Sequence, residues 1–200
     1  MIIGIAGYGG SGKTLLAVSI VRHLQLHGYK VITNLLSYKY RDYDLITELP
    51  ELMHEMVYNH SLVNEKRVAL VDEIQNIIDS RESMHSANKQ ISRILFQLRK
   101  ARIDMIYTLQ DYYSVDVRLR RITERLLMPE YDEITHKMSI TITDKNGIEL
   151  GHTMLIINPA VYELYNTYEF LDIDSSIDFT NMFGENTKTK KSKRKAEPVE

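Results

Sequence analysis

The sequence predicts an α/β fold with a mainly parallel central sheet and helices on both of its faces, and three observations support this fold class. A short apolar run, residues 2–6, leads through a glycine-rich segment into a helical stretch, residues 13–27. Further apolar runs then alternate with helical stretches, an order that is typical of parallel sheets covered on both faces. After residue 135 apolar and polar residues alternate on either side of a turn, which predicts an added β-hairpin.

Each element follows from its local pattern. In residues 13–27, Leu16, Ile20 and Leu24 recur about one helical turn apart, and Gly28 follows as a C-cap. Short apolar runs predict the remaining strands of the parallel sheet at 29–33, 68–71 and 103–109. Amphipathic patterns predict further helices at 50–58, 87–102 and 115–125. The hairpin is expected at 138–143 and 148–158, around the turn residues 144–147.

Composition limits the domain organisation. The 200 residues are 44% hydrophobic and 26% charged, which describes one globular domain, expected over residues 1–184. Residues 185–200 hold six Lys or Arg and almost no large apolar side chain, so we expect a basic, disordered tail. The chain has no cysteine, and no apolar run approaches the roughly 20 residues that span a bilayer, so we expect no membrane segment and a cytoplasmic protein.

The glycine-rich segment GYGGSGKT, residues 7–14, matches the P-loop pattern. It lies between a predicted strand and a predicted helix, the context in which backbone N–H groups and a helix N-terminus cradle phosphates. Lys13 is expected to reach the β- and γ-phosphates, and the Thr14 hydroxyl to ligate Mg²⁺. The residues expected to bind a nucleoside triphosphate are Gly7, Gly9, Gly10, Ser11, Gly12, Lys13 and Thr14.

Two acids follow the predicted strand in RVALVDEIQ, residues 67–75. At the strand end, Asp72 is expected to hold Mg²⁺, as the Walker B aspartate does, and Glu73 to act as the general base toward water. The alternative is a pair of acids stabilised by the dipole of a following helix. Because a P-loop needs a metal partner, we favour the catalytic interpretation, and the pair predicts an ATPase.

The next predicted strand ends at Gln110, which we expect to face the γ-phosphate between the two Walker strands as a sensor. The alternative is an ordinary polar residue at the start of a helix. No guanine-reading segment of the NKxD type is present, which favours ATP over GTP.

The ordered set GYGGSGKT, ALVDEIQ, LRKARIDMIYTLQ and ELYNTYE resembles the FtsK–HerA superfamily of P-loop ATPases. The resemblance is strongest to the zonular occludens toxin-like ATPases of filamentous phages and to viral genome-packaging ATPases, and it spans about residues 1–170. The toxin-like proteins usually carry a membrane-spanning helix after the ATPase domain. This sequence shows none, which favours the packaging type.

The resemblance implies a ring, expected to be a hexamer, that hydrolyses ATP and acts on double-stranded DNA, with a portal or capsid protein as a possible partner and the host cytoplasm as its location. It also implies an arginine from the neighbouring subunit in each site. Arg99 best matches that catalytic arginine and Arg102 is a weaker candidate, the alternative being that both are solvated. Three further arginines could line a pore, contact other subunits or pair with nearby acids: Arg118, Arg120 and Arg121. The alternative function is a non-motor P-loop enzyme, a nucleotide kinase or signalling NTPase, acting as a monomer or dimer.

Overall fold

The computed structural model describes residues 1–45, 65–76, 98 and 102–166. All of them belong to one compact unit, Met1–Glu169. The helices predicted at 50–58 and, apart from Leu98 and Arg102, at 87–102 lie outside the described residues. So do Arg99, the basic tail and the predicted domain boundary at residue 184. The extent of the domain therefore stays a prediction.

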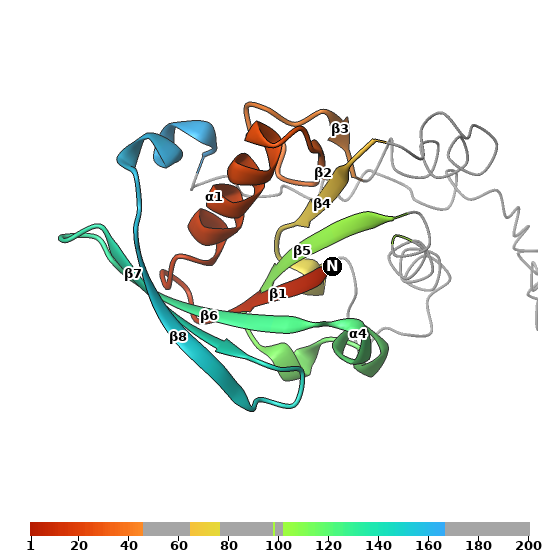
Figure 1. Ribbon diagram of the computed structural model, residues 1–200, viewed down its shortest axis with the longest axis vertical. Coiled ribbons are helices and arrows are strands. Elements are labelled where there is room, and N and C mark those ends of the chain that lie inside the picture. The colour runs from red at the N-terminus through yellow and green to blue at the C-terminus, as the bar shows by residue number, and fades with distance from the viewer. Residues whose placement is uncertain (46–64, 77–97, 99–101, 167–200) are drawn as a thin grey trace, which may run out of the picture. The chain divides into compact units, whose positions relative to one another are not determined.

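The described strands form one eight-stranded sheet in the order β3-β2-β4-β5-β1-β6-β7-β8 (Figure 1). The six strands from β3 to β6 are parallel, and β7 and β8 are antiparallel additions, so the predicted α/β fold class is confirmed. The strands are β1 Ile2–Ala6, β2 Lys30–Thr33, β3 Tyr43–Asp44, β4 Arg67–Val71, β5 Ile103–Leu109, β6 Arg125–Asp132, β7 Lys137–Thr143 and β8 Glu149–Ile156. The order places β5, whose last residue Leu109 precedes Gln110, between β4 and β1.

Two apolar clusters lie on opposite faces of the sheet. On one face, helix α1, Lys13–Leu26, packs Leu16, Val18 and Val21 against strand residues such as Ile5 and Val31, and η4, Pro159–Leu164, packs beside it. The other face carries Leu98, the 3-10 helix η3, Tyr112–Ser114, and helix α4, Val117–Ile122. Figure 1 shows α1 and α4 on opposite sides of the sheet. The predicted helices on both faces are thus confirmed.

The segment from residue 115 to 132 differs from the predicted helix over 115–125. Helix α4 covers only Val117–Ile122, and Arg125 already belongs to strand β6. Asp116 caps α4 by accepting from the Arg118 N–H, and Thr123 ends it in an extended conformation. The C-terminal end of the predicted helix was wrong because β6 contains charged residues and a proline, which are uncommon in strands.

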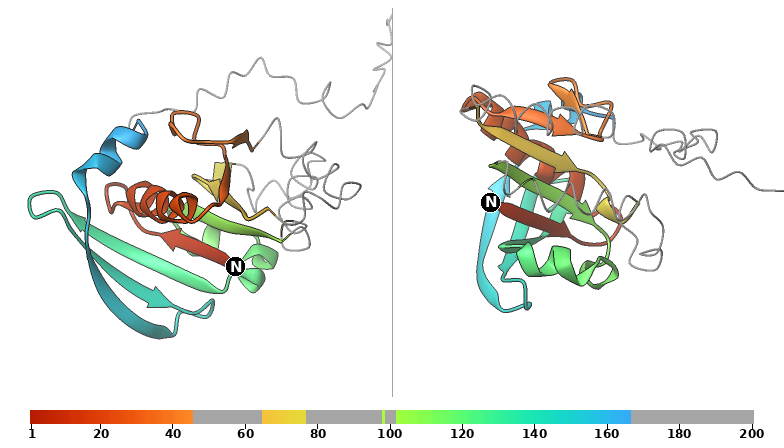
Figure 2. Two further views of the ribbon diagram at one scale, coloured as in Figure 1. Left: turned by 45° about the horizontal axis from the view of Figure 1, so that its top comes forward. Right: turned by 90° about the vertical axis from the view of Figure 1, so that its right-hand side faces the viewer.

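The hairpin predicted after residue 135 is confirmed as β7 and β8, which pair antiparallel from Lys137–Ile156 to Thr143–Glu149. β6 joins it to the parallel strands, since β6 pairs parallel with β1 and antiparallel with β7. The three strands continue the sheet beyond β1 as a long ribbon (Figure 2). In the part of the chain that the structure describes, no helix is long and apolar enough to cross a membrane.

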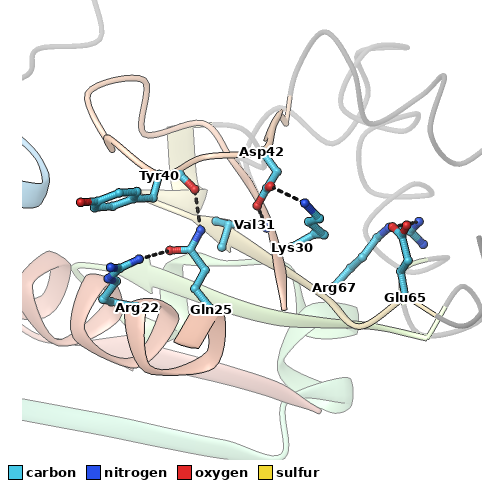
Figure 3. Close-up of polar contacts among 8 residues, drawn as sticks. All are labelled: Arg22, Gln25, Lys30, Val31, Tyr40, Asp42, Glu65 and Arg67. Atoms are coloured by element: carbon cyan, nitrogen blue, oxygen red, sulfur yellow. Dashed lines mark hydrogen bonds and ion pairs between the residues drawn. The ribbon is translucent and has the colours of Figure 1, made fainter. Parts of the chain in front are cut away.

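The loop after β2 is tied back to its own strand (Figure 3). The Asp42 carboxylate accepts from Lys30 Nζ at 3.1 Å and from the Val31 N–H at 2.8 Å. Near the start of β4, Arg67 pairs with Glu65 at 2.8 Å. The first two contacts hold the loop after β2 against the start of that strand, and the third lies at the start of β4.

Candidate nucleotide-binding and catalytic site

The loop between β1 and α1 has the backbone that a phosphate cradle requires. Gly10 and Gly12 have φ angles of 79° and 87°, in the left-handed region that glycine adopts without strain. Gly12 is also tightly enclosed, because a Cβ there would lie 2.8 Å from the Tyr131 Cβ and from the Met138 Cε. Its carbonyl accepts the first helical hydrogen bond of α1, from the Leu16 N–H. The predicted loop is therefore held at the N-terminus of α1 by its own backbone and by the β6–β7 pair.

Lys13 lies over this loop. Its side chain is 9% exposed, and Nζ donates to the Tyr8 carbonyl at 2.8 Å. Burial lowers the Lys13 pKa, and the nearby carboxylates of Glu73 and Asp72 oppose that shift. The charge of the ammonium is thus felt by both acids that the sequence singled out.

Thr14 and Asp72 meet across the sheet edge. The Thr14 hydroxyl donates to the two carboxylate oxygens of Asp72, at 3.1 and 3.4 Å. α1 supplies the hydroxyl from its first turn, and Asp72 follows the last residue of β4. Residues 58 apart in sequence therefore form one oxygen-rich cluster beside the P-loop.

Two residues that the sequence analysis did not single out hold Asp72 in place. Thr108, on β5, donates its hydroxyl to Asp72 Oδ1 at 2.6 Å and accepts from the Glu73 N–H at 2.8 Å. Asn34, just after β2, uses its side-chain amide to donate to the Asp72 carbonyl and to accept from the Asp72 N–H, both at 2.8 Å. The sheet order explains both contacts, because β2 and β5 flank β4 and end at the same edge.

The ionisation of Asp72 reflects these neighbours. Burial raises the Asp72 pKa, the hydrogen bonds from Thr108 and Thr14 lower it, and the charge of Glu73 raises it further. The net direction is upward, because desolvation is the largest cause. A cation bound next to this carboxylate would lower its pKa and favour its charged form.

Glu73 has a backbone conformation that is uncommon for a non-glycine residue. Its φ angle is 49°, in the left-handed region, and the hydrogen bond from its N–H to Thr108 maintains that conformation. Its Oε2 accepts at 3.0 Å from Nδ2 of Asn76, the last residue of the 3-10 helix η2, Ile74–Asn76. The turn directs the chain away from β4 directly after Asp72, so the two acids do not continue along a regular helix.

Oxygen donors of this kind suit Mg²⁺. The ion favours octahedral coordination with one or two protein oxygens, the remaining positions being filled by water and phosphate. Thr14 and Asp72 supply a hydroxyl and a carboxylate that already lie within hydrogen-bond distance of each other. In the described ranges, no group of three or more His, Cys, Asp or Glu residues is arranged to hold a metal ion.

Gln110 follows β5 and is exposed beside the first glycine of the loop. The Gly7 N–H donates to the Leu109 carbonyl at 3.3 Å, which attaches the start of the P-loop to the end of β5. Gln110 thus lies at the same sheet edge as Asp72, next to the loop that leads to Thr14. Its sensor role stays a prediction.

The arginines occupy different places. Arg102 precedes β5 at the opposite end of that strand from Gln110, so it lies far from the P-loop of its own chain. Arg118 pairs with Asp116 at 2.8 Å and lowers the pKa of that carboxyl, as the salt-bridge alternative proposed. Arg120 lies over the Tyr113 ring at 5.5 Å. None of these three is part of the cluster around Asp72, and Arg99 lies outside the described residues.

The mainly parallel sheet, with a glycine-rich loop between β1 and α1, gives the chain the fold of a P-loop nucleoside triphosphatase. Its sequence matches the model of the ATPase family associated with various cellular activities (AAA) over residues 3–138, and the chain belongs to this family. No curated protein sequence matches it.

Many solved structures share this fold, and two of them serve as examples. The N-terminal domain of zonular occludens toxin from Neisseria meningitidis has a TM-score of 0.56 at 20% identity, over 82% of this chain and 97% of that one. The genome-packaging NTPase B204 of Sulfolobus turreted icosahedral virus 2, in complex with AMP, has a TM-score of 0.50 at 16% identity, over 76% of this chain and 96% of that one.

At these identities the likeness concerns the fold. It confirms the fold that the resemblance to zonular occludens toxin-like and packaging ATPases implies. Family membership makes the chain an ATPase in class.

Proposed function

We propose that the chain hydrolyses ATP at the site formed by Lys13, Thr14, Asp72 and Glu73. The observation that carries this proposal is the meeting of Thr14 and Asp72 beside Lys13, with Glu73 next in the chain. A lysine, a hydroxyl, a metal-binding carboxylate and a second carboxylate are the set that nucleotide hydrolysis requires.

Each residue has a distinct role in this proposal. Gly7, Gly9, Gly10, Ser11 and Gly12 present backbone N–H groups to the phosphates, and Lys13 neutralises charge on the β- and γ-phosphates. Thr14 and Asp72 hold Mg²⁺, which when bound would neutralise phosphate charge in the transition state. Gln110 contacts the γ-phosphate or the attacking water from the end of β5.

Glu73 acts as the general base. Its carboxylate accepts a proton from water as the water oxygen forms its bond to the γ-phosphorus. The bond from that phosphorus to the β–γ bridging oxygen breaks, which gives ADP and phosphate. The hydrogen bond that the Glu73 N–H donates to the Thr108 hydroxyl supports this role because it fixes where the side chain begins.

We further propose that the chain works as a ring, with a hexamer as the expected form, that moves double-stranded DNA. The fold likeness to a genome-packaging NTPase supports this function, and so does the sequence resemblance to DNA-translocating ATPases. A portal or capsid protein is the partner that such a motor would have, in the cytoplasm or, for a viral chain, the host cytoplasm.

In a ring, one subunit can complete the site of the next. Arg102 lies at the opposite sheet edge from its own P-loop, so it could reach a nucleotide only across a subunit interface. Arg99 is the stronger candidate for this role on sequence grounds. An arginine finger supplied in this way raises the rate by about 10³ to 10⁵ in enzymes where it has been measured.

The test is ATP turnover as a function of protein concentration, with and without double-stranded DNA, using Glu73→Gln as the blank. A ring motor predicts that turnover per chain rises steeply with concentration and rises further with DNA. Flat turnover that is indifferent to DNA would instead favour a self-contained enzyme, the kinase or signalling NTPase alternative. Arg99→Ala should lower turnover and leave ATP affinity unchanged if Arg99 is the finger.

A further inference from the structure

Strand β6 runs alongside the P-loop from the beginning of the loop to its end. A Cβ built on Gly7 would lie 3.8 Å from the Pro129 carbonyl oxygen, and one built on Gly12 would lie 2.8 Å from the Tyr131 Cβ. The pairing of β6 with β1 ends at Leu127, before either of these β6 positions. The loop therefore lies against the part of β6 that no longer pairs with β1.

Two side chains that face each other across β6 and β7 hold Gly12. Tyr131 and Met138 are direct cross-strand partners, so their side chains project from the same face of the sheet. A Cβ on Gly12 would lie 2.8 Å from the Met138 Cε, and 2.8 and 3.5 Å from the Tyr131 Cβ and Cγ. Met138 is fully buried in the apolar cluster under α1. The end of the P-loop is thus seated on this pair.

The Tyr131 hydroxyl is tied to two further elements. It accepts a hydrogen bond from the Tyr162 hydroxyl, in η4, and lies 3.0 Å from Nδ1 of His136, in the turn between β6 and β7. Because Tyr162 donates to it, the Tyr131 hydroxyl is free to donate in turn to an unprotonated His136. η4 also packs beside α1 (Figure 1). The hydroxyl therefore joins the turn to an element that contacts the helix of the P-loop.

Gly12 sets the point at which α1 begins. Its carbonyl accepts the first helical hydrogen bond, and Lys13 and Thr14 follow it directly. In the proposed function these two residues bind phosphate and Mg²⁺. A misplacement of about 1 Å in such groups can cost about 10²-fold in rate. Contacts that fix the position of Gly12 therefore bear directly on phosphate binding.

We propose that Tyr131 is a positioning residue for the P-loop: its side chain seats Gly12, and its hydroxyl couples the loop to the β6–β7 turn and to η4. This inference rests on the proposed function, because it needs phosphates in the loop. Asp72 and Glu73, the acids of the hydrolytic step, follow β4 and lie outside this set of contacts. Tyr131 therefore acts on binding, through Gly12, and not on the hydrolytic step.

The test measures the affinity of the full chain for inorganic tripolyphosphate, in the presence of Mg²⁺, by calorimetry. Tyr131→Ala should weaken binding about 5- to 20-fold, because the ring and both hydroxyl contacts are lost. Tyr131→Phe should weaken it about 2- to 5-fold, because only the hydroxyl contacts are lost. KM for ATP should rise by the same factors while kcat changes less than about 3-fold, the pattern of an interaction lost equally from the ground state and the transition state.

Tyr162→Phe removes the bond between the two tyrosines from its other side. Combined with Tyr131→Phe, it should weaken binding no further than Tyr131→Phe does alone, because that hydrogen bond is already lost. Effects that multiply would show that Tyr162 acts independently of Tyr131, and would contradict the coupling to η4.

Tyr29→Ala is the matched control. Tyr29 is a half-buried tyrosine that packs on the same apolar cluster, but it precedes β2, at the opposite edge of the sheet from the P-loop. Its loss should lower the melting temperature and leave the affinity for tripolyphosphate unchanged. If the Tyr131 variants bind tripolyphosphate as tightly as this control does, the inference is overturned, and Tyr131→Phe alone decides if Tyr131→Ala does not fold. Failure of the unaltered chain to bind tripolyphosphate would instead contradict the proposed function.

Discussion

The side-chain amide of Asn34 makes two hydrogen bonds with the backbone of Asp72, one to its carbonyl and one from its N–H, each 2.8 Å long. β2 ends at Thr33, so the amide continues the β2–β4 pairing beyond the point where the backbone can. Asn34 is 2% exposed, and its contacts orient the residue expected to hold Mg²⁺.

Asn34→Ala should therefore destabilise the fold by about 2 to 4 kcal/mol, because it leaves two backbone groups of Asp72 without their partner. Urea unfolding measures this change. Asn146→Ala, in the exposed β7–β8 turn, is the matched control and should cost less than about 0.5 kcal/mol. Equal stability of the two variants would show that the amide contacts contribute little.

Thr108→Val should lower kcat about 10- to 100-fold with little change in KM, because Asp72 and the Glu73 backbone both lose their contact with the hydroxyl. Thr108→Ser keeps the hydroxyl and should restore most of the activity. Steady-state ATPase kinetics provide the measurement. If the serine variant is as slow as the valine variant, Thr108 acts through packing and not through its hydroxyl.

Gly12→Ala should unfold at a clearly lower temperature than the original chain. The substitution places a Cβ at a φ of 87° and within 2.8 Å of Tyr131 and Met138, and the backbone strain alone costs about 1 to 2 kcal/mol. Gly9→Ala is the matched control, since a Cβ at Gly9 meets nothing within 4 Å. Thermal unfolding should separate the two variants, and equal melting temperatures would contradict the close packing around Gly12.

The stability of the fold should fall at high pH in a way that depends on Tyr38. Burial raises the pKa of Tyr38 to about 12, and its hydroxyl donates to Gln25 at 2.7 Å. An unfolded tyrosine ionises near pH 10, so above that pH the unfolded chain releases a proton that the folded chain retains. This contribution to stability is complete below about pH 10 and is lost as the pH rises toward 12.

Tyr38→Phe removes that pH dependence. The difference in unfolding free energy between the original chain and the variant should shrink by about 1 kcal/mol from pH 9 to pH 11. Other buried tyrosines titrate equally in both proteins and cancel. A constant difference across this range would show that Tyr38 ionises as freely in the folded chain as in the unfolded one.

The sequence predicted the strands and the loop that carry the P-loop motif, because an apolar run, several glycines and an amphipathic helix each leave a local signal. It also predicted that Asp72 lies at a strand end near Thr14, and the structure places the two within hydrogen-bond distance. Asn34 and Thr108 were missed because a single polar residue after an apolar run has no distinctive pattern. Their positions at the ends of the two strands beside β4 could have identified them, had the strand order been known.

Strand β6 was not predicted, for a different reason. Pro129 and several charged residues make the segment look unlike an interior strand. The pairing with β1 covers only Arg125–Leu127, so the proline lies beyond it and removes no hydrogen bond from the parallel ladder. Whether a strand accepts a proline at a given position depends on how it pairs with its neighbour. That pairing cannot be seen in the local sequence.

The most direct test of the catalytic site compares Glu73→Gln with Glu163→Gln, an exposed glutamate in η4, for ATP binding and for phosphate release in a single turnover. We expect both variants to bind ATP as the original chain does, and only Glu73→Gln to slow phosphate release, by about 10² or more. Phosphate release at the original rate in Glu73→Gln would contradict the assignment of Glu73 as the general base.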